Sequence, residues 1–187
     1  MRIVQLLKCF SLVGALMVQG CASVQTSGNQ PDGRYCVRVP SNRVCTQQPV
    51  PTADREAHVK RFASDVDAHV IWVIRGAWLD ATDRVAVEVG HQQVATLPYT
   101  LIRVAVRPGE VTVRLTDGET LFRGGEAVAI NGASGEQTFV EVVAHIRPFV
   151  VTRFSLRQLS PAEGRRKALA SKLIFDGREA GTDLGRP

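Results

Sequence analysis

Short segments rich in β-branched residues follow one another from His69 to Leu156, separated by turn residues at spacings of about 8–12 residues. Residues 69–74 form an almost continuous apolar run, which is typical of a strand buried on both faces. Residues 84–89 alternate instead, which indicates a strand with one buried face. The sequence shows no helical pattern between these segments, which disfavours a parallel α/β sheet. It predicts a mainly β fold over residues 69–175, an antiparallel β-sandwich, with a barrel as the alternative.

A short helix is expected to close this domain. Ser160 can cap the helix, Pro161 suits its first position, and Glu163 completes a capping box. We expect the helix to run to about Lys172, with apolar residues packed on the sandwich, namely Ala168, Leu169 and Leu173. Residues 176–187 offer no apolar content to bury, so the sequence predicts a disordered tail.

The N-terminus reads as a targeting segment. Arg2 and Lys8 precede the apolar residues 9–18, and Gly20 and Cys21 follow. This order resembles the lipobox of bacterial lipoproteins and implies cleavage between Gly20 and Cys21, with residues 1–20 as the signal peptide. An ordinary secretory signal with a coincidental cysteine is the alternative.

The lipobox also implies an anchor and a location. Three acyl chains on Cys21 would hold the chain on membrane lipid. Ala22 favours the outer membrane, periplasmic face, of a Gram-negative host. Residues 21–34 are small and polar, so we expect a flexible tether.

Cys36 and Cys45 predict a disulfide hairpin at the start of residues 35–68, because export permits disulfides and residues 40–42 are turn formers. A two-residue turn would set the cysteines opposite each other, whereas a three-residue loop would shift them by one position. Two cysteines without a nearby histidine make a poor zinc site. A short helix is expected over residues 54–66, capped by Asp54 and with one apolar face formed by Val59, Phe62 and Val66.

The sequence contains no motif that predicts catalysis. The four histidines fall in no metal-binding spacing, and no nucleophile or nucleotide-binding motif is present. We therefore expect no enzyme activity, no metal and no cofactor. The net charge of +5 comes from scattered residues, which argues against nucleic acid as a partner. Trp72 is expected in the core, whereas Trp78 beside Asp80 could form a binding platform for a sugar or a protein, or could cover the end of the sandwich.

Part of the chain resembles a known family. The matching features are the strand that ends in Arg75, the hairpin over residues 87–97, the pair Tyr99-Thr100, the turn Pro108-Gly109, residues 138–142 and residues 156–164. Together they resemble the bacterial lipoprotein family with domain of unknown function 2846, and the hairpin resembles the PEGA β module. This chain departs from the pattern with Gly90-His91 in place of Asp-Gly and with Glu110 in place of His.

The resemblance implies a function without catalysis. It implies a membrane-anchored β-sandwich and no particular substrate. We expect this domain to bind or scaffold an envelope protein partner. Two other functions stay open. One is an accessory subunit of a secretion or pilus machine, and the other is a protein associated with a cell-wall hydrolase.

Overall fold

The computed structural model describes residues 32–39, 42–76, 85–116, 126–147 and 150–178, and within these ranges the chain forms two helices and eleven strands. The helices are α1 (Ala53–Val59) and α2 (Pro161–Ala170). The strands are β1 (Cys36–Val39), β2 (Asn42–Cys45), β3 (His69–Arg75), β4 (Val85–Val89), β5 (Gln92–Thr96), β6 (Thr100–Val106), β7 (Gly109–Thr116), β8 (Ala127–Gly132), β9 (Gln137–Arg147), β10 (Val150–Leu159) and β11 (Lys172–Arg178).

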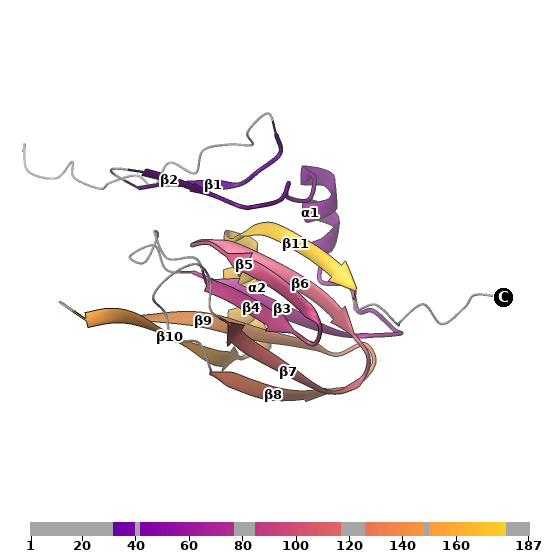
Figure 1. Cartoon of the computed structure of the whole chain (residues 1–187). Coiled ribbons are helices and arrows are strands. Elements are labelled where there is room, and N and C mark those ends of the chain that lie inside the picture. Colours follow the sequence, from indigo (N-terminus) through magenta and orange to yellow (C-terminus); the bar gives the residue numbers. More distant parts are fainter. Residues whose placement is uncertain (1–31, 40–41, 77–84, 117–125, 148–149, 179–187) are drawn as a thin grey trace, which may run out of the picture.

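Two sheets face each other, which confirms the predicted β-sandwich (Figure 1). One sheet has five strands in the order β10-β9-β3-β6-β11, and the other has four in the order β5-β4-β7-β8. Apolar side chains from both sheets fill the space between them, including those of Ile71, Val87 and Val113. Because strand residues alternate between faces, the valines at every second position of β4 and β7 all lie in this core.

Strand β3 lies at the centre of the five-stranded sheet, and all seven of its residues are buried. This confirms the sequence prediction for residues 69–74. The pairing differs from a purely antiparallel sandwich at two places, because β3 pairs with β9 and β6 pairs with β11 in parallel. Between β3 and β9 the chain enters the other sheet twice, as β4–β5 and as β7–β8, and returns in between as β6, the other neighbour of β3.

The two helices cover the outer face of the five-stranded sheet, over a second apolar cluster built on Trp72 and Phe139. These rings stack with their centroids 5.9 Å apart, so the expected core position of Trp72 is confirmed. In α2, Ser160 is the N-cap as predicted, and its hydroxyl accepts a hydrogen bond from the Glu163 N–H at 3.4 Å. Ala168 packs on the sheet as expected.

The end of the chain departs from prediction. Leu169 does not pack on the sandwich, since its side chain is 59% exposed. Leu173 is buried, but on a strand that the sequence analysis missed, β11. A disordered tail from Asp176 is therefore wrong for residues 176–178, which belong to β11. Residues 179–187 lie outside the described part.

The N-terminal hairpin is confirmed, with Cys36 directly opposite Cys45 in the register that a two-residue turn gives. Its Tyr35, Val37 and Val44 are buried in the core between the sheets. In Figure 1 the hairpin lies on the side of the sandwich that carries β5 and β11.

The helix expected over residues 54–66 is shorter than predicted. Helix α1 begins after its N-cap, Thr52, and not after Asp54, and it ends at Val59. Phe62 then takes a left-handed backbone conformation with φ of 52°, which no helix can continue through. Val66 is consequently 76% exposed and does not extend an apolar helix face, whereas Val59 and Phe62 do pack in the outer cluster.

Candidate functional site

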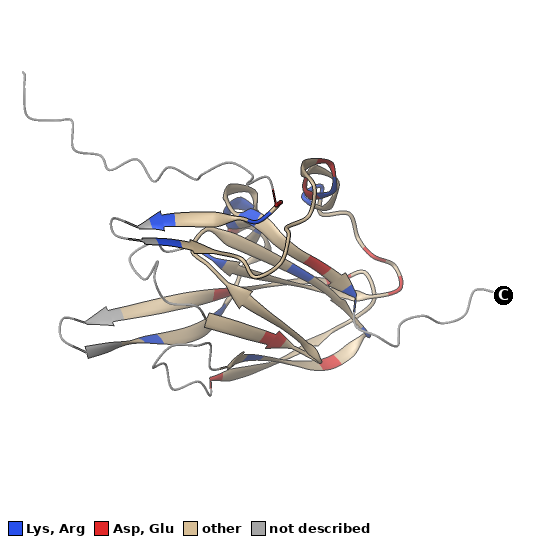
Figure 2. Cartoon of the chain, turned by 45° about the horizontal axis from the view of Figure 1, so that its top comes forward, with Lys and Arg blue, Asp and Glu red and all other residues tan. Residues whose placement is uncertain are grey.

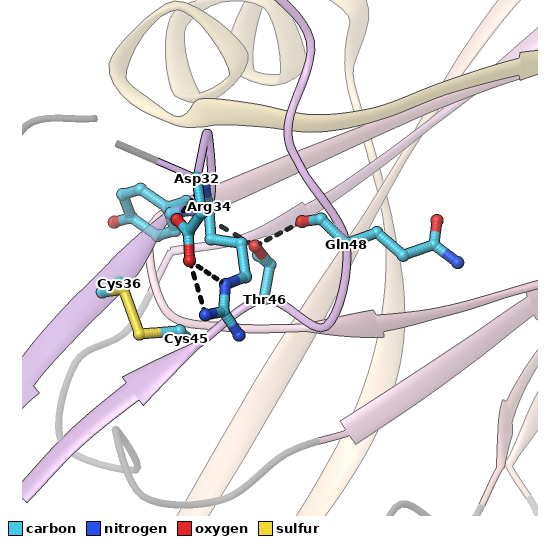
Figure 3. Close-up of a disulfide and its surroundings, with 7 residues drawn as sticks. Asp32, Arg34, Cys36, Cys45, Thr46 and Gln48 are labelled. Carbon is cyan, nitrogen blue, oxygen red and sulfur yellow. Dashed lines mark hydrogen bonds and ion pairs between the residues drawn. A yellow bond between two sulfur atoms is a disulfide. The ribbon is translucent and has the colours of Figure 1, made fainter. Parts of the chain in front are cut away.

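The predicted site residues fall in three places. Gly20 and Cys21, the cleavage and lipidation residues, lie outside the described residues, and so do Trp78 and Asp80 of the expected binding platform. Cys36 and Cys45 form a disulfide, as predicted (Figure 3). The structure therefore places one of the three predicted sites.

The disulfide lies in a hairpin whose open end is held together by hydrogen bonds. Figure 3 shows Asp32 turned toward Arg34, whose Nε donates to the carboxylate at 2.6 Å. The Thr46 hydroxyl donates to the carbonyl of Gln48 at 2.8 Å and accepts from the Tyr35 N–H at 3.2 Å. These contacts hold together the segments that enter and leave the hairpin.

Tyr35 joins the hairpin to the sandwich. Its hydroxyl donates to the Pro98 carbonyl at 3.3 Å, and its ring lies in the core between the sheets. Burial raises the pKa of Tyr35 to about 12, and the nearby Tyr99 adds to the shift. The phenol therefore stays neutral at any physiological pH and acts as a fixed hydrogen-bond donor.

A polar groove lies at the turns that join β4 to β5 and β6 to β7. It has a volume of about 520 Å³, and its charged and polar lining includes Glu88, His91, Arg107, Glu110, Thr112 and Arg114. Glu88 and Arg114 are register partners on β4 and β7. No phenylalanine, tyrosine or tryptophan lines the groove. Its mixture of carboxylates and guanidinium groups suits a partner with polar groups of both charges.

The groove combines residues from two hairpins that are distant in the sequence. Gly90 and His91 form part of its lining, and so does Glu110. Residues 90 and 110 belong to different hairpins, and nothing in their sequence spacing shows that they meet.

Charged residues also gather between the helices and the five-stranded sheet. The Glu141 carboxylate accepts from Lys167 and from Arg157, each at 2.5 Å, and Glu163 lies 3.4 Å from both cations. Burial alone would raise the pKa of Glu141, but these two donors outweigh it, so the pKa lies below its ordinary value. The carboxylate is therefore ionised and neutralised, and it is not poised to act as an acid.

A second charged cluster joins β6, β11 and the segment after α1. Arg103 donates to Asp176 at 2.8 Å and lies 3.4 Å from Asp65. Asp176 also accepts from Arg55 at 2.5 Å, and Asp65 pairs with Arg178 at 2.6 Å. The Arg103 guanidinium lies 5.9 Å from the Trp72 ring centroid. These contacts hold the charged end of β11, whose apolar part is buried through Leu173 and Ile174, and they indicate a structural role.

One pair of side chains resembles part of a catalytic arrangement. His145 Nε2 and Ser155 Oγ lie 2.7 Å apart on the exposed side of β9 and β10. A nucleophilic serine also needs a group that orients the histidine and donors that stabilise an oxyanion. Among the described residues, no acidic side chain bonds to this histidine, and neither residue lines the polar groove. The sequence analysis missed this pair because the two residues lie on different strands.

The described residues include no group of three His, Cys, Asp or Glu side chains placed to hold a metal ion. No helix within them is both long and apolar enough to cross a membrane. No family model matches the chain, and a search of curated proteins finds no match. The resemblance given above therefore stays a prediction.

Proposed function

We propose that this chain is an exported lipoprotein, anchored in the outer membrane through acylated Cys21, whose β-sandwich binds or scaffolds an envelope protein without catalysis. The observation that carries the proposal is the Cys36–Cys45 disulfide. Disulfides persist in oxidising compartments and are rare in the bacterial cytosol. An export signal at residues 1–20 and a disulfide in the first folded element agree with each other, although they rest on independent features.

The charges of the domain support a binding role. Three carboxylates with little exposure, Glu141 and the partly buried Glu56 and Asp176, are each paired with cations, so none of them is available as a general acid or base. The polar groove, in contrast, is open to solvent and carries both signs of charge. We propose this groove as a contact surface for the partner.

The intact mass of the protein extracted from membranes tests the proposal. We expect a mass that equals residues 21–187 plus a diacylglyceryl group and one further acyl chain, with alkylation at Cys36 and Cys45 only after reduction. A matched Cys21→Ser variant should stay unprocessed and gain no acyl mass. An unacylated wild-type mass, or thiols that react without reduction, would contradict the proposal.

A further inference from the structure

The outer surface of the two helices carries arginines that are not neutralised by ion pairs within the described residues. Arg61, Arg165 and Arg166 are exposed, and they form no ion pair with the residues that the structure describes. Arg165 lies over the Phe62 ring at 5.8 Å from its centroid. Arginines in salt bridges cannot offer their full charge to a partner, but these three can.

The two helices bring these arginines together. The Lys60 Nζ donates to the carbonyls of Leu169 and Ser171 at 3.3 and 2.5 Å, which fixes the end of α1 against the end of α2. Figure 2 shows both helices on the same side of the sandwich. Arg61 follows Lys60 directly, so its position is fixed beside α2. We call Arg61, Phe62, Arg165, Arg166 and Leu169 the basic helical surface.

Helix α2 is held with one face outward. Gly164 and Ala168, one turn apart, face the sheet. A Cβ at Gly164 would overlap the ring of Phe139, which shows how closely the helix lies on the sheet. Arg166 and Leu169 lie away from this face, Arg165 flanks it over the Phe62 ring, and all three residues are exposed. The fold therefore presents two cations and a 59% exposed leucine on a rigid surface.

This combination fits one kind of partner. Basic residues around an exposed apolar side chain are typical of helices that lie on anionic membranes, where the cations contact phosphates and the apolar group enters the headgroup region. A second observation, which rests on the proposed lipid anchor, also favours a membrane surface as the partner. Residues 21–31 can span at most about 40 Å when fully extended. The anchor would thus keep the domain within about its own diameter of the lipid.

We infer that the basic helical surface docks on anionic phospholipid headgroups, so that the domain lies on the membrane with α1 and α2 toward the lipid and the polar groove of the opposite sheet toward the compartment. The inference concerns the orientation of the domain and the lipid class. Acylation fixes neither of these.

Vesicle sedimentation tests the inference without the acyl chains. Residues 21–187 with Cys21→Ser are mixed with phosphatidylglycerol–phosphatidylcholine vesicles and with phosphatidylcholine vesicles at low salt. We expect binding to the anionic vesicles only, and loss of binding at high salt. Arg165→Gln with Arg166→Gln should weaken binding about 25-fold, since each basic residue near the surface contributes about fivefold.

A control variant with the same change of charge separates the surface from the net charge. Gln93→Glu with Asn131→Asp removes two units of charge on the exposed side of the opposite sheet and should leave vesicle binding nearly unchanged. Thermal melts establish that both variants fold. The absence of wild-type binding to anionic vesicles, or an equal loss in the two variants, would overturn the inference. Either result leaves the acylation of Cys21 to be judged by its mass.

Discussion

Removal of the Cys36–Cys45 disulfide should destabilise the whole sandwich and not the hairpin alone. The bond closes a ten-residue loop, for which the chain-entropy model gives about 2.7 kcal/mol of stabilisation. The hairpin is not an independent unit, because Tyr35, Val37 and Val44 belong to the core between the sheets. Loosening the hairpin therefore exposes part of that core to water, which lowers the free energy of unfolding of the whole sandwich.

Urea unfolding of a Cys36→Ala, Cys45→Ala variant measures this cost. In a Trp78→Phe background, the fluorescence of buried Trp72 reports on the far face of the five-stranded sheet. With a slope of about 2 kcal/mol per molar urea for a chain of this size, the midpoint should fall by about 1.3 M.

Reduction supplies the control for this experiment. A reductant should move the parent protein to the midpoint of the double-alanine variant and should leave that variant unchanged. A Trp72 transition that does not shift would refute the reasoning, because it would show that the hairpin unfolds separately from the sandwich.

Three further predictions follow from buried groups. Gly164→Ala should lower the free energy of unfolding by about 1–3 kcal/mol in the same urea assay, because its Cβ overlaps Phe139. Glu141→Gln should lower the free energy of unfolding by about 1–2 kcal/mol at pH 7, and this cost should shrink as the pH falls below the ordinary glutamate pKa. Its folded-state pKa is lowered, so the stabilisation exists above the unfolded pKa and is lost as pH falls. Burial lowers the pKa of His69 against the opposing charge of Glu136, so stability should fall as pH drops below about 6.5, and His69→Gln should remove that slope. If the pH dependence of stability is the same in the His69→Gln variant, His69 is not the group responsible for it.

The predictable part of the fold is the part set by local pattern. The continuous apolar run at residues 69–74 identifies the central strand, and Ser160 with Pro161 identifies the start of α2. In the hairpin, the two possible turns gave two registers, and only packing against the sandwich chooses between them. Local sequence pattern predicts an element correctly where the intrinsic propensity of its residues agrees with their burial in the fold.

The parts that the sequence analysis missed depend on distant partners. Strand β11 contains Asp176, whose charge argues against a sheet until Arg103 and Arg55 are placed beside it. The polar groove and the basic helical surface likewise combine residues that are far apart in sequence. Nothing in the spacing of Arg61 and Arg165 shows that the helices lie side by side.

Strand β11 also bears on the order in which the chain can fold. It is the last described element, yet it completes the edge of the five-stranded sheet beside β6 and holds α1 through the pairs of Lys172 with Glu56 and of Asp176 with Arg55. During synthesis from the N-terminus, α1 is made early, but its ion pairs with β11 can form only after that late strand has been made. Long-range pairing of this kind makes folding slow and concerted. A chain that ends before Lys172 should hold α1 less firmly, through Val59 and Lys60 without the two ion pairs to β11, and should leave the edge of β6 open to other strands.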